Sequence, residues 1–299
     1  MPGQKPLPEL LVTGEYPGPA LWRISKGNHD LWILATLAPL PEKLKWRSRA
    51  VEARIAKSQV VFAPPENVLN MRVFAYYASE WNRALKNPGG KSLAKVLPPE
   101  TYTRWVAAKE KYLGSYDEHE RPLVAANDLF HGALHRTGLT NDDFVWQTVE
   151  NFAQHQNIKI TRFQIKMNHD RPMSWIRDLA TPRPEEVTCL EMTIDRLNTD
   201  IGPMRRRANQ WSVGDIESLL AEPLPDDRIT CFNILYSTPQ MHSQLETAEN
   251  MQSDEWLAAA DKALNSNVST FAVLPISEMV KSGGWLDKLQ AKGYVIHQP

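Results

Sequence analysis

The clearest structural signal in the chain is the nearly continuous apolar run Leu31-Trp32-Ile33-Leu34-Ala35-Thr36-Leu37. A run of this kind is typical of an interior strand that is covered on both faces. Residues 20–25 alternate apolar and polar, which is the period of a half-buried strand, and the turn-rich residues 25–30 connect the two segments. The sequence therefore predicts a β-hairpin near the start of the fold.

Helix and strand patterns follow the hairpin and return near the other end of the chain. Residues 45–58 have the period of an amphipathic helix, and residues 59–63 form a short apolar strand stopped by two prolines. Residues 270–275 are again apolar and strand-like, and residues 285–297 predict a helix, a glycine stop and a last strand. These patterns predict an α/β fold with a central mixed sheet built from both chain ends.

Helical periodicity dominates the residues between these two parts. It extends over residues 66–264, includes a helical pattern at 226–237, and is interrupted by a short strand pattern at 158–160. Residues 1–20 are rich in Pro and Gly and predict an extended arm. Because no low-complexity linker divides the chain, we expect a single domain over residues 1–299 with a mainly helical insertion at 66–264.

The composition excludes several classes of protein. Among 299 residues, 34 Lys and Arg balance 35 Asp and Glu to a formal net charge of -1. This balance argues against a nucleic-acid partner, because such binding relies on phosphate neutralisation by a basic face. The longest apolar runs fall far short of the roughly 20 residues that a membrane span needs. The N-terminus lacks the apolar segment of a signal peptide, which leaves a cytoplasmic chain or an exported chain whose signal was removed.

Several side chains are candidates for binding on residue type alone. His131 and His135 lie on one face of a predicted helix, as zinc ligands can, although an ordinary amphipathic helix is the preferred interpretation. The three arginines at 205–207, followed by Trp211, form a candidate anion-binding patch, unless they pair with nearby acidic side chains at a helix end. Trp46 and Trp211 lie among polar residues and are candidates for stacking on a ligand.

The two cysteines, Cys189 and Cys231, could form one disulfide or none. Their number and spacing alone leave both the reducing cytoplasm and an oxidising compartment open.

Both ends of the chain carry signatures of a known family. The first covers residues 14–41, from Gly14-Glu15-Tyr16-Pro17-Gly18 through the apolar run to Pro39-Leu40-Pro41, and the second covers residues 270–295. Between them lie Arg207-Ala208-Asn209-Gln210-Trp211, then Gly214-Asp215, and both cysteines. With these features the sequence resembles the TraB/GumN family over nearly the whole chain.

The resemblance carries expectations about fold and location. It implies an α/β fold related to that of the erythromycin esterase and haem-binding ChaN-like proteins. Family members are commonly exported, and Cys189 and Cys231 match the family's own cysteine pair. The resemblance therefore implies a disulfide between them and a periplasmic or secreted location.

In the active branch of the family, which includes metal-dependent peptidases, two Gly-x-x-His motifs follow two strands and a Glu follows a third. Imidazoles and a carboxylate at strand ends can hold a divalent metal whose bound water becomes the nucleophile. In this sequence the motifs fall on Ala35-Thr36-Leu37-Ala38 and Pro275-Ile276-Ser277-Glu278. The Glu position falls on Phe62-Ala63-Pro64-Pro65, with Glu66 displaced. The resemblance therefore implies a degenerate site that holds no metal and no cofactor.

These loops and the arginine segment define the candidate site. The cleft candidates are Thr36, Ala38, Glu66, Arg207, Ser277 and Glu278, and the ligand-binding candidates are Arg207, Trp211 and Trp46. The leading hypothesis is a pseudoenzyme of the cell envelope that binds a small ligand, a peptide or a protein partner. One alternative is a peptidase-like hydrolase with a rebuilt site, in which Glu66, Glu278 and Arg207 converge.

Another alternative is an interaction module that acts through the helical insertion. A large exposed apolar patch on residues 66–180 would favour this hypothesis. The family name also suggests an exopolysaccharide context, without identifying a substrate.

Overall fold

A computed structural model describes residues 18–69, 75–167, 172–222, 224, 231 and 239–299 of the chain. Residues 1–17 of the predicted N-terminal arm lie outside the described residues. The same holds for the predicted helical segment 226–237, apart from Cys231. No helix in the described ranges is both long enough and apolar enough to cross a membrane.

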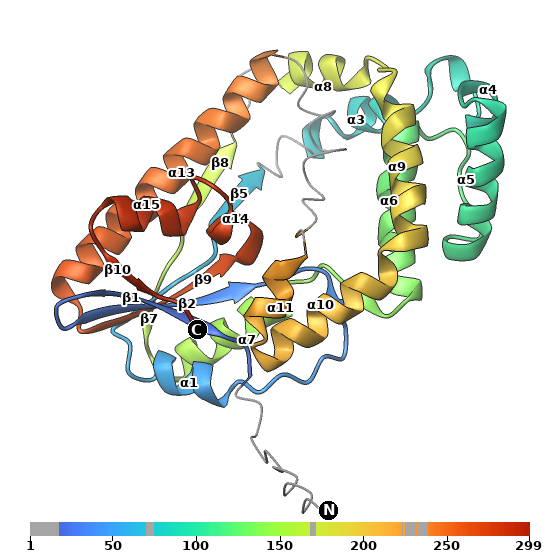
Figure 1. Ribbon diagram of the computed structural model, residues 1–299. Coiled ribbons are helices and arrows are strands. Elements are labelled where there is room, and N and C mark those ends of the chain that lie inside the picture. The colour runs from blue at the N-terminus through green and yellow to red at the C-terminus, as the bar shows by residue number, and fades with distance from the viewer. Residues whose placement is uncertain (1–17, 70–74, 168–171, 223, 225–230, 232–238) are drawn as a thin grey trace, which may run out of the picture.

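The described residues form a six-stranded mixed sheet in the order β10-β1-β2-β9-β4-β7 (Figure 1). The strands are β1 (Leu21–Lys26), β2 (His29–Thr36), β4 (Val60–Phe62), β7 (Lys159–Thr161), β9 (Ser269–Pro275) and β10 (Val295–His297). The predicted hairpin is confirmed, because β1 pairs antiparallel with β2 from Leu21 opposite Leu34 to Lys26 opposite His29. The strands β2, β9, β4 and β7 run parallel to one another, so the predicted α/β fold is also confirmed.

One strand of this sheet comes from the middle of the chain. The edge strand β7 coincides with the short strand pattern that interrupts the helical residues 66–264, and it pairs with β4. The sheet therefore combines both chain ends with one strand from between them.

Helices cover both faces of the sheet. Figure 1 shows α13 (Pro239–Ser266), α14 (Ile276–Val280) and α15 (Trp285–Ala291) on one side, with α1 (Arg49–Ile55) and α7 (Phe144–His155) on the other. Successive side chains of β9, from Phe271 to Leu274, are all 0% exposed. Coverage on both faces explains why the central strands are continuously apolar rather than alternating.

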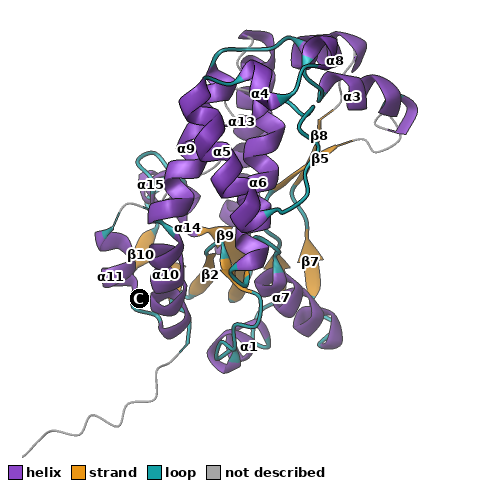
Figure 2. Cartoon of the chain, turned by 90° about the vertical axis from the view of Figure 1, so that its right-hand side faces the viewer, coloured by secondary structure: helices purple, strands orange, loops and turns teal. Residues whose placement is uncertain are grey.

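The helical part of the chain lies beyond the ends of the parallel strands. Its helices are α3 (Ala78–Ala84), α4 (Leu93–Val96), α5 (Pro99–Tyr112), α6 (Pro122–Arg136), α8 (Pro172–Ala180), α9 (Glu185–Thr199), α10 (Ile201–Val213) and α11 (Ile216–Ala221). Figure 2 shows α5, α6 and α9 packed side by side. Two-stranded pairs, β3 (Leu40–Pro41) with β6 (Leu139–Thr140) and β5 (Glu66–Leu69) with β8 (Gln164–Met167), lie outside the main sheet.

The helices α5, α6 and α9 bury a second apolar cluster that includes Trp105, Leu129 and Leu190. The structure joins Cys189 of α9 to Cys231 by a disulfide, with the two Cα atoms 5.3 Å apart. The sulfur of Cys189 is fully buried in this cluster, away from the ends of the sheet strands.

Candidate functional site

The two loops that correspond to the family's histidine motifs leave the sheet side by side. The strands β2 and β9 are parallel neighbours, and Thr36 lies opposite Pro275 at their carboxyl ends. The next parallel strand, β4, ends at the same edge and continues into Ala63 and the two prolines. In open α/β sheets this edge is where ligands bind, because the loops that follow the strands surround a crevice there.

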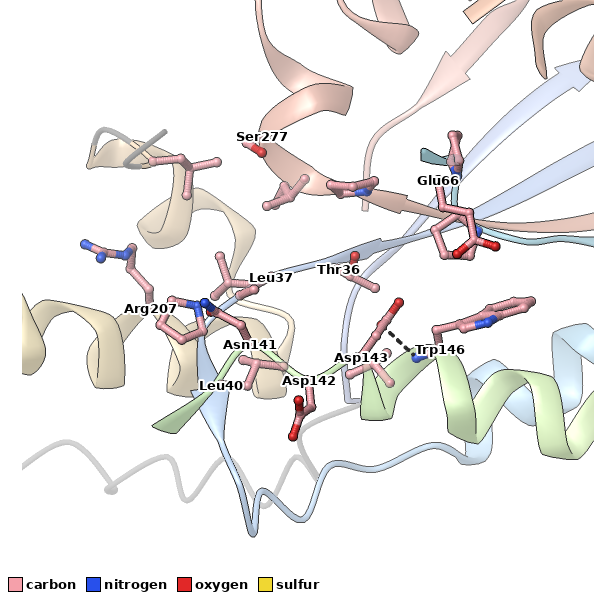
Figure 3. A pocket seen from close by; sticks show the side chains of 18 of the residues that line it. Thr36, Leu37, Leu40, Glu66, Asn141, Asp142, Asp143, Trp146, Arg207 and Ser277 are labelled. Carbon is pink, nitrogen blue, oxygen red and sulfur yellow. Dashed lines mark hydrogen bonds between the residues drawn. The ribbon is translucent and has the colours of Figure 1, made fainter. Parts of the chain in front are cut away.

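A pocket with a volume of about 420 Å³ occupies this edge (Figure 3). Its walls come from the loops after β2 (36–40), β4 (63–66) and β9 (275–277), and from residues 141–146 at the start of α7. Arg162, Arg196, Arg207 and Leu224 complete the lining. A volume of this size is in the range of pockets that bind small molecules.

The cleft candidates Thr36, Ala38 and Ser277 all line the pocket, as the resemblance implies. The hydroxyl of Thr36 donates to the backbone oxygen of Leu274 over 3.4 Å. Ala38 presents a methyl group where the motif has an imidazole, so this position offers no lone pair to a metal.

Glu278 is placed differently from the other candidates and does not contribute to the pocket lining. The helix α14 begins directly after Pro275, and its first turn brings the Glu278 carboxylate within 2.5 Å of the Lys281 ammonium group. The three side chains that the rebuilt-hydrolase hypothesis requires are therefore not gathered in this pocket. Glu66 and Arg207 line it, and Figure 3 shows them at opposite ends.

Two carboxylates face the pocket at one end. Glu66 begins β5 and accepts a hydrogen bond from the side-chain amide of Gln164. Asp143 caps α7, since its Oδ1 accepts from the backbone nitrogen of Trp146 over 3.2 Å. Figure 3 shows the Asp143 carboxylate directed towards Thr36 and Glu66, whereas that of Asp142 points away. We call Glu66 and Asp143 the acidic end of the pocket.

The protein environment changes the acidity of Asp143. Its side chain is exposed at the mouth of the pocket, and partial desolvation of the carboxyl group by the neighbouring protein raises its pKa. The hydrogen bond from Trp146 acts in the opposite direction, and the negative charge of Glu66 raises the pKa of Asp143 further. Both carboxylates lie at the same end of the pocket in Figure 3, where two negative charges disfavour each other.

Asp143 was absent from the candidates that the sequence suggested, although a signal for it exists. Asn141-Asp142-Asp143 stands directly before the apolar periodicity of α7, and Asp is among the residues that most often cap a helix N-terminus. The cap position aims the side chain at the strand ends, which only the packing of α7 against the sheet reveals.

Arginines form the other end of the pocket, which we call the basic end. One nitrogen of Arg207, which is 5% exposed, donates to both oxygens of Asp200 over 2.9 and 3.0 Å. Arg196 donates to Oδ2 of the same carboxylate over 3.2 and 3.3 Å. Burial lowers the pKa of Arg196, the bonds to Asp200 raise it, and the charge of Arg207 lowers it again.

The other two arginines of the segment are occupied elsewhere. Arg205 donates to the backbone oxygen of Thr137, and Arg206 pairs with Glu222 over 2.8 Å. The three arginines therefore do not act as one anion-binding patch, and Arg207 is the member that reaches the pocket.

Trp211, a predicted ligand-binding residue, is 1% exposed and lies outside the pocket lining. Its indole nitrogen donates to the backbone oxygen of Ala35 over 2.7 Å, so the side chain anchors the end of β2 to α10. Trp46, also predicted to contact a ligand, packs on Trp211 with ring centroids 5.9 Å apart. Neither tryptophan lines the pocket, and both pack next to the end of β2.

The donor atoms of a metal site are missing both at the histidine pair and, among the described residues, at the pocket. His131 and His135 lie on the exposed side of α6, away from the pocket lining. Within the described ranges, no group of three or more His, Cys, Asp or Glu side chains could hold a metal ion. In the pocket, the motif's two imidazoles are replaced by a methyl group and by a glutamate turned towards Lys281, so the residues present do not fit the metal of the active branch.

Comparisons with known proteins agree with the sequence signatures. Neither the curated proteins nor the solved structures gave a match to the chain. The sequence model of the TraB/PrgY/gumN family matches residues 20–298, from the strand that opens the hairpin to the last strand of the sheet. The chain therefore belongs to the TraB/PrgY/gumN family.

Proposed function

We propose that this member of the family binds a small ligand in the strand-end pocket and does not carry out metal-dependent hydrolysis. The observation that carries the proposal is the exchange of donor atoms at the pocket. Ala38 lines the wall with a methyl group, and the Glu278 carboxylate is bound to Lys281 instead of facing the strand ends. The cavity is retained at the position where ligands bind in α/β sheets.

The carboxylates that remain in the pocket are poor substitutes for the lost ligands. Glu66 and Asp143 each already accept a hydrogen bond from the protein. Two carboxylates without an imidazole lack the nitrogen donors that zinc prefers. The surviving chemistry of the pocket is therefore recognition by charge and hydrogen bonds.

We also propose that the protein acts in the cell envelope or is secreted. The disulfide between Cys189 and Cys231 supports this, because such bonds persist in oxidising compartments. Fractionation of cells that produce the full-length gene product, with thiol labelling of both cysteines, tests the location. Recovery of a fully labelled, reduced protein from the cytoplasm would contradict it.

The absence of hydrolysis is tested on the purified protein. Its metal content is measured first, and a peptide library is then incubated with the protein and an excess of Zn²⁺, Mn²⁺ or Co²⁺. We expect no stoichiometric metal and no cleavage that depends on added metal. Cleavage abolished by a chelator and restored by one of these ions would overturn the proposal.

The role of the pocket is tested by filling it. Ala38→Trp places a large side chain on the wall, and Lys57→Trp adds the same side chain at an exposed position outside the lining. We expect ligands found by a thermal-shift screen to stabilise the wild type and Lys57→Trp but not Ala38→Trp. An equal ligand-induced shift of the melting temperature in the three proteins would show that the ligands do not bind in this pocket, and it would contradict the proposal.

A metal-free hydrolase remains a second candidate because two carboxylates, Glu66 and Asp143, line the same pocket, and the surroundings raise the pKa of Asp143. A pair of carboxylates is a common arrangement for general acid and base catalysis. Hydrolysis that persists in a chelator and is lost in both Glu66→Gln and Asp143→Asn would favour it. The interaction hypothesis gains less support, since Tyr76 and Met173 are the large apolar side chains exposed in the described part of 66–180.

A further inference from the structure

The pocket carries opposite charges at its two ends. Glu66 and Asp143 form the acidic end, and Arg207, held by Asp200, forms the basic end (Figure 3). An arrangement with separated charges discriminates among ligands by the positions of their own charges. The charges of the pocket therefore indicate the chemical class of its ligand.

Neither carboxylate of the acidic end forms an ion pair with a described residue. In the part of the chain that the structure describes, Glu66 accepts a hydrogen bond from a neutral amide and Asp143 from a backbone nitrogen. Arg162 also lines the pocket, but its guanidinium group pairs with Glu150. Two carboxylates that repel each other across an open pocket would both gain from a positive group placed between them.

The basic end offers donors to a negative group. Arg207 uses one terminal nitrogen for Asp200, and its other nitrogens form no hydrogen bond with the described residues. Its side chain is held in place by that contact and is almost fully buried, so its position is fixed before a ligand arrives. A fixed guanidinium group binds a carboxylate or phosphate with little loss of side-chain entropy.

Apolar side chains and prolines also line the pocket, including Leu37, Pro39, Leu40, Pro65 and Ile276. Figure 3 shows Leu37 and Leu40 between Arg207 and Asp143. This part of the lining favours an uncharged aliphatic or ring-shaped spacer, because burying a further charge there without a partner is costly.

We propose that the pocket binds a zwitterionic ligand, with an amine or guanidinium group between Glu66 and Asp143 and an anionic group towards Arg207. This inference rests on the proposed binding function and deepens it. It also predicts that ligands with one charge, or with two charges of the same sign, bind more weakly than a zwitterion of matching length.

Simple zwitterions test the two ends without mutation of the buried arginine. The probes are aminohexanoate and aminooctanoate, with hexylamine and hexanoate as controls that each keep one charge. Binding is measured by isothermal titration calorimetry or by ligand-observed NMR. We expect at least one zwitterion to bind more tightly than both controls by about tenfold or more, since each control lacks one of the two charged hydrogen bonds.

Variants locate the positive group of the probe. Glu66→Gln and Asp143→Asn remove one charge each, and Asn preserves the helix cap because it caps as well as Asp. Asp254→Asn is the matched control, as Asp254 is an exposed carboxylate outside the pocket lining. We expect a roughly tenfold loss of zwitterion affinity in the first two variants and no change in the control.

The outcomes separate this inference from the proposed function. Equal affinity for zwitterions and singly charged controls, or an equal loss in all three variants, would overturn the zwitterion assignment. A neutral ligand that binds the wild type and not Ala38→Trp would also overturn it, while the proposed binding function would stand. Metal-dependent cleavage in the assay described above would instead overturn the proposed function.

Discussion

Two buried arginines of this chain have similar exposure and very different surroundings. Arg121, which is 3% exposed, pairs with the buried Glu186 through two nitrogens and also donates to the backbone oxygens of Ala84, Leu179 and Thr181. Arg207, which is 5% exposed, has Asp200 as its partner and borders a cavity. Burial alone therefore does not separate a structural charge from one that can bind a ligand. The two kinds of arginine differ in how many of their N–H donors already form hydrogen bonds with the protein.

The largest expected effect is the loss of the first arginine. Arg121→Met leaves the Glu186 carboxylate buried without its cation and should lower the free energy of unfolding by about 3–5 kcal/mol. Urea denaturation followed by circular dichroism measures the change. Arg104→Met, which removes an exposed partner of Asp195, is the control and should cost less than about 1 kcal/mol. A loss in Arg121→Met no larger than in this control would contradict the structural role.

The disulfide stabilises the same helical region and gives the next effect. It closes a loop with a sequence separation of 42. In the chain-entropy view, Cys189→Ala with Cys231→Ala lowers the free energy of unfolding by about 4 kcal/mol. The measurement compares urea denaturation of the double variant with that of the oxidised wild type. The wild type in reductant should approach the double variant, and a wild type that is insensitive to reductant would speak against the bond.

A smaller effect is expected for the arginine at the pocket. Arg207→Met leaves Asp200 with its hydrogen bonds from Arg196, so we expect a loss of about 1–3 kcal/mol, less than for Arg121→Met. The same urea denaturation ranks the two variants. If Arg207→Met destabilises the protein more than Arg121→Met, the distinction between the two regions fails.

The smallest expected effect is at the acidic end, where ionisation of Asp143 makes the free energy of unfolding depend on pH. Because the pKa of Asp143 is raised in the folded protein, the folded state binds more protons than the unfolded state just above the ordinary aspartate pKa. This carboxyl group therefore lowers stability as the pH rises from that value through its raised pKa. Asp143→Asn removes the penalty and should stabilise the protein at neutral pH by less than about 1 kcal/mol, since solvent in the open pocket screens the charge.

Melting temperatures of the wild type and Asp143→Asn, measured from acidic to neutral pH, give this difference. It should shrink as the pH falls, because the wild-type carboxyl group is then neutral as well. A stabilisation that is the same at every pH would show that ionisation of Asp143 is not its cause.

The sequence predicted the sheet well because the central strands carry a strong local signal. Leu31, Ile33, Leu34 and Ala35 of the first run are buried, as are Phe271–Leu274 of β9. Few arrangements other than an interior strand bury such runs. The helix predicted at 45–58 is shorter in the structure, where α1 covers Arg49–Ile55. Helix ends depend on capping and tertiary contacts more than on periodicity, so their positions follow less directly from the sequence.

The sequence predicted only part of the candidate site, and two residues show why. Trp211 has polar sequence neighbours, but Met204, Arg207 and Ala208 share its helix face and are all buried. Spacing along one helix face was the better guide here than adjacency in the chain. Glu278 was expected in the cleft by its place in the motif, but the first turn of α14 rotates it towards Lys281.

The register that sets Thr36 opposite Pro275 has a consequence for how this scaffold can change. Backbone hydrogen bonds between β2 and β9 fix where both loops begin, whatever side chains follow. The few positions after each strand can therefore exchange one chemistry for another while the architecture stays the same. The backbone at the strand ends is therefore a constant scaffold. Substitution of the few residues that follow the strands is the direct route to a different ligand preference.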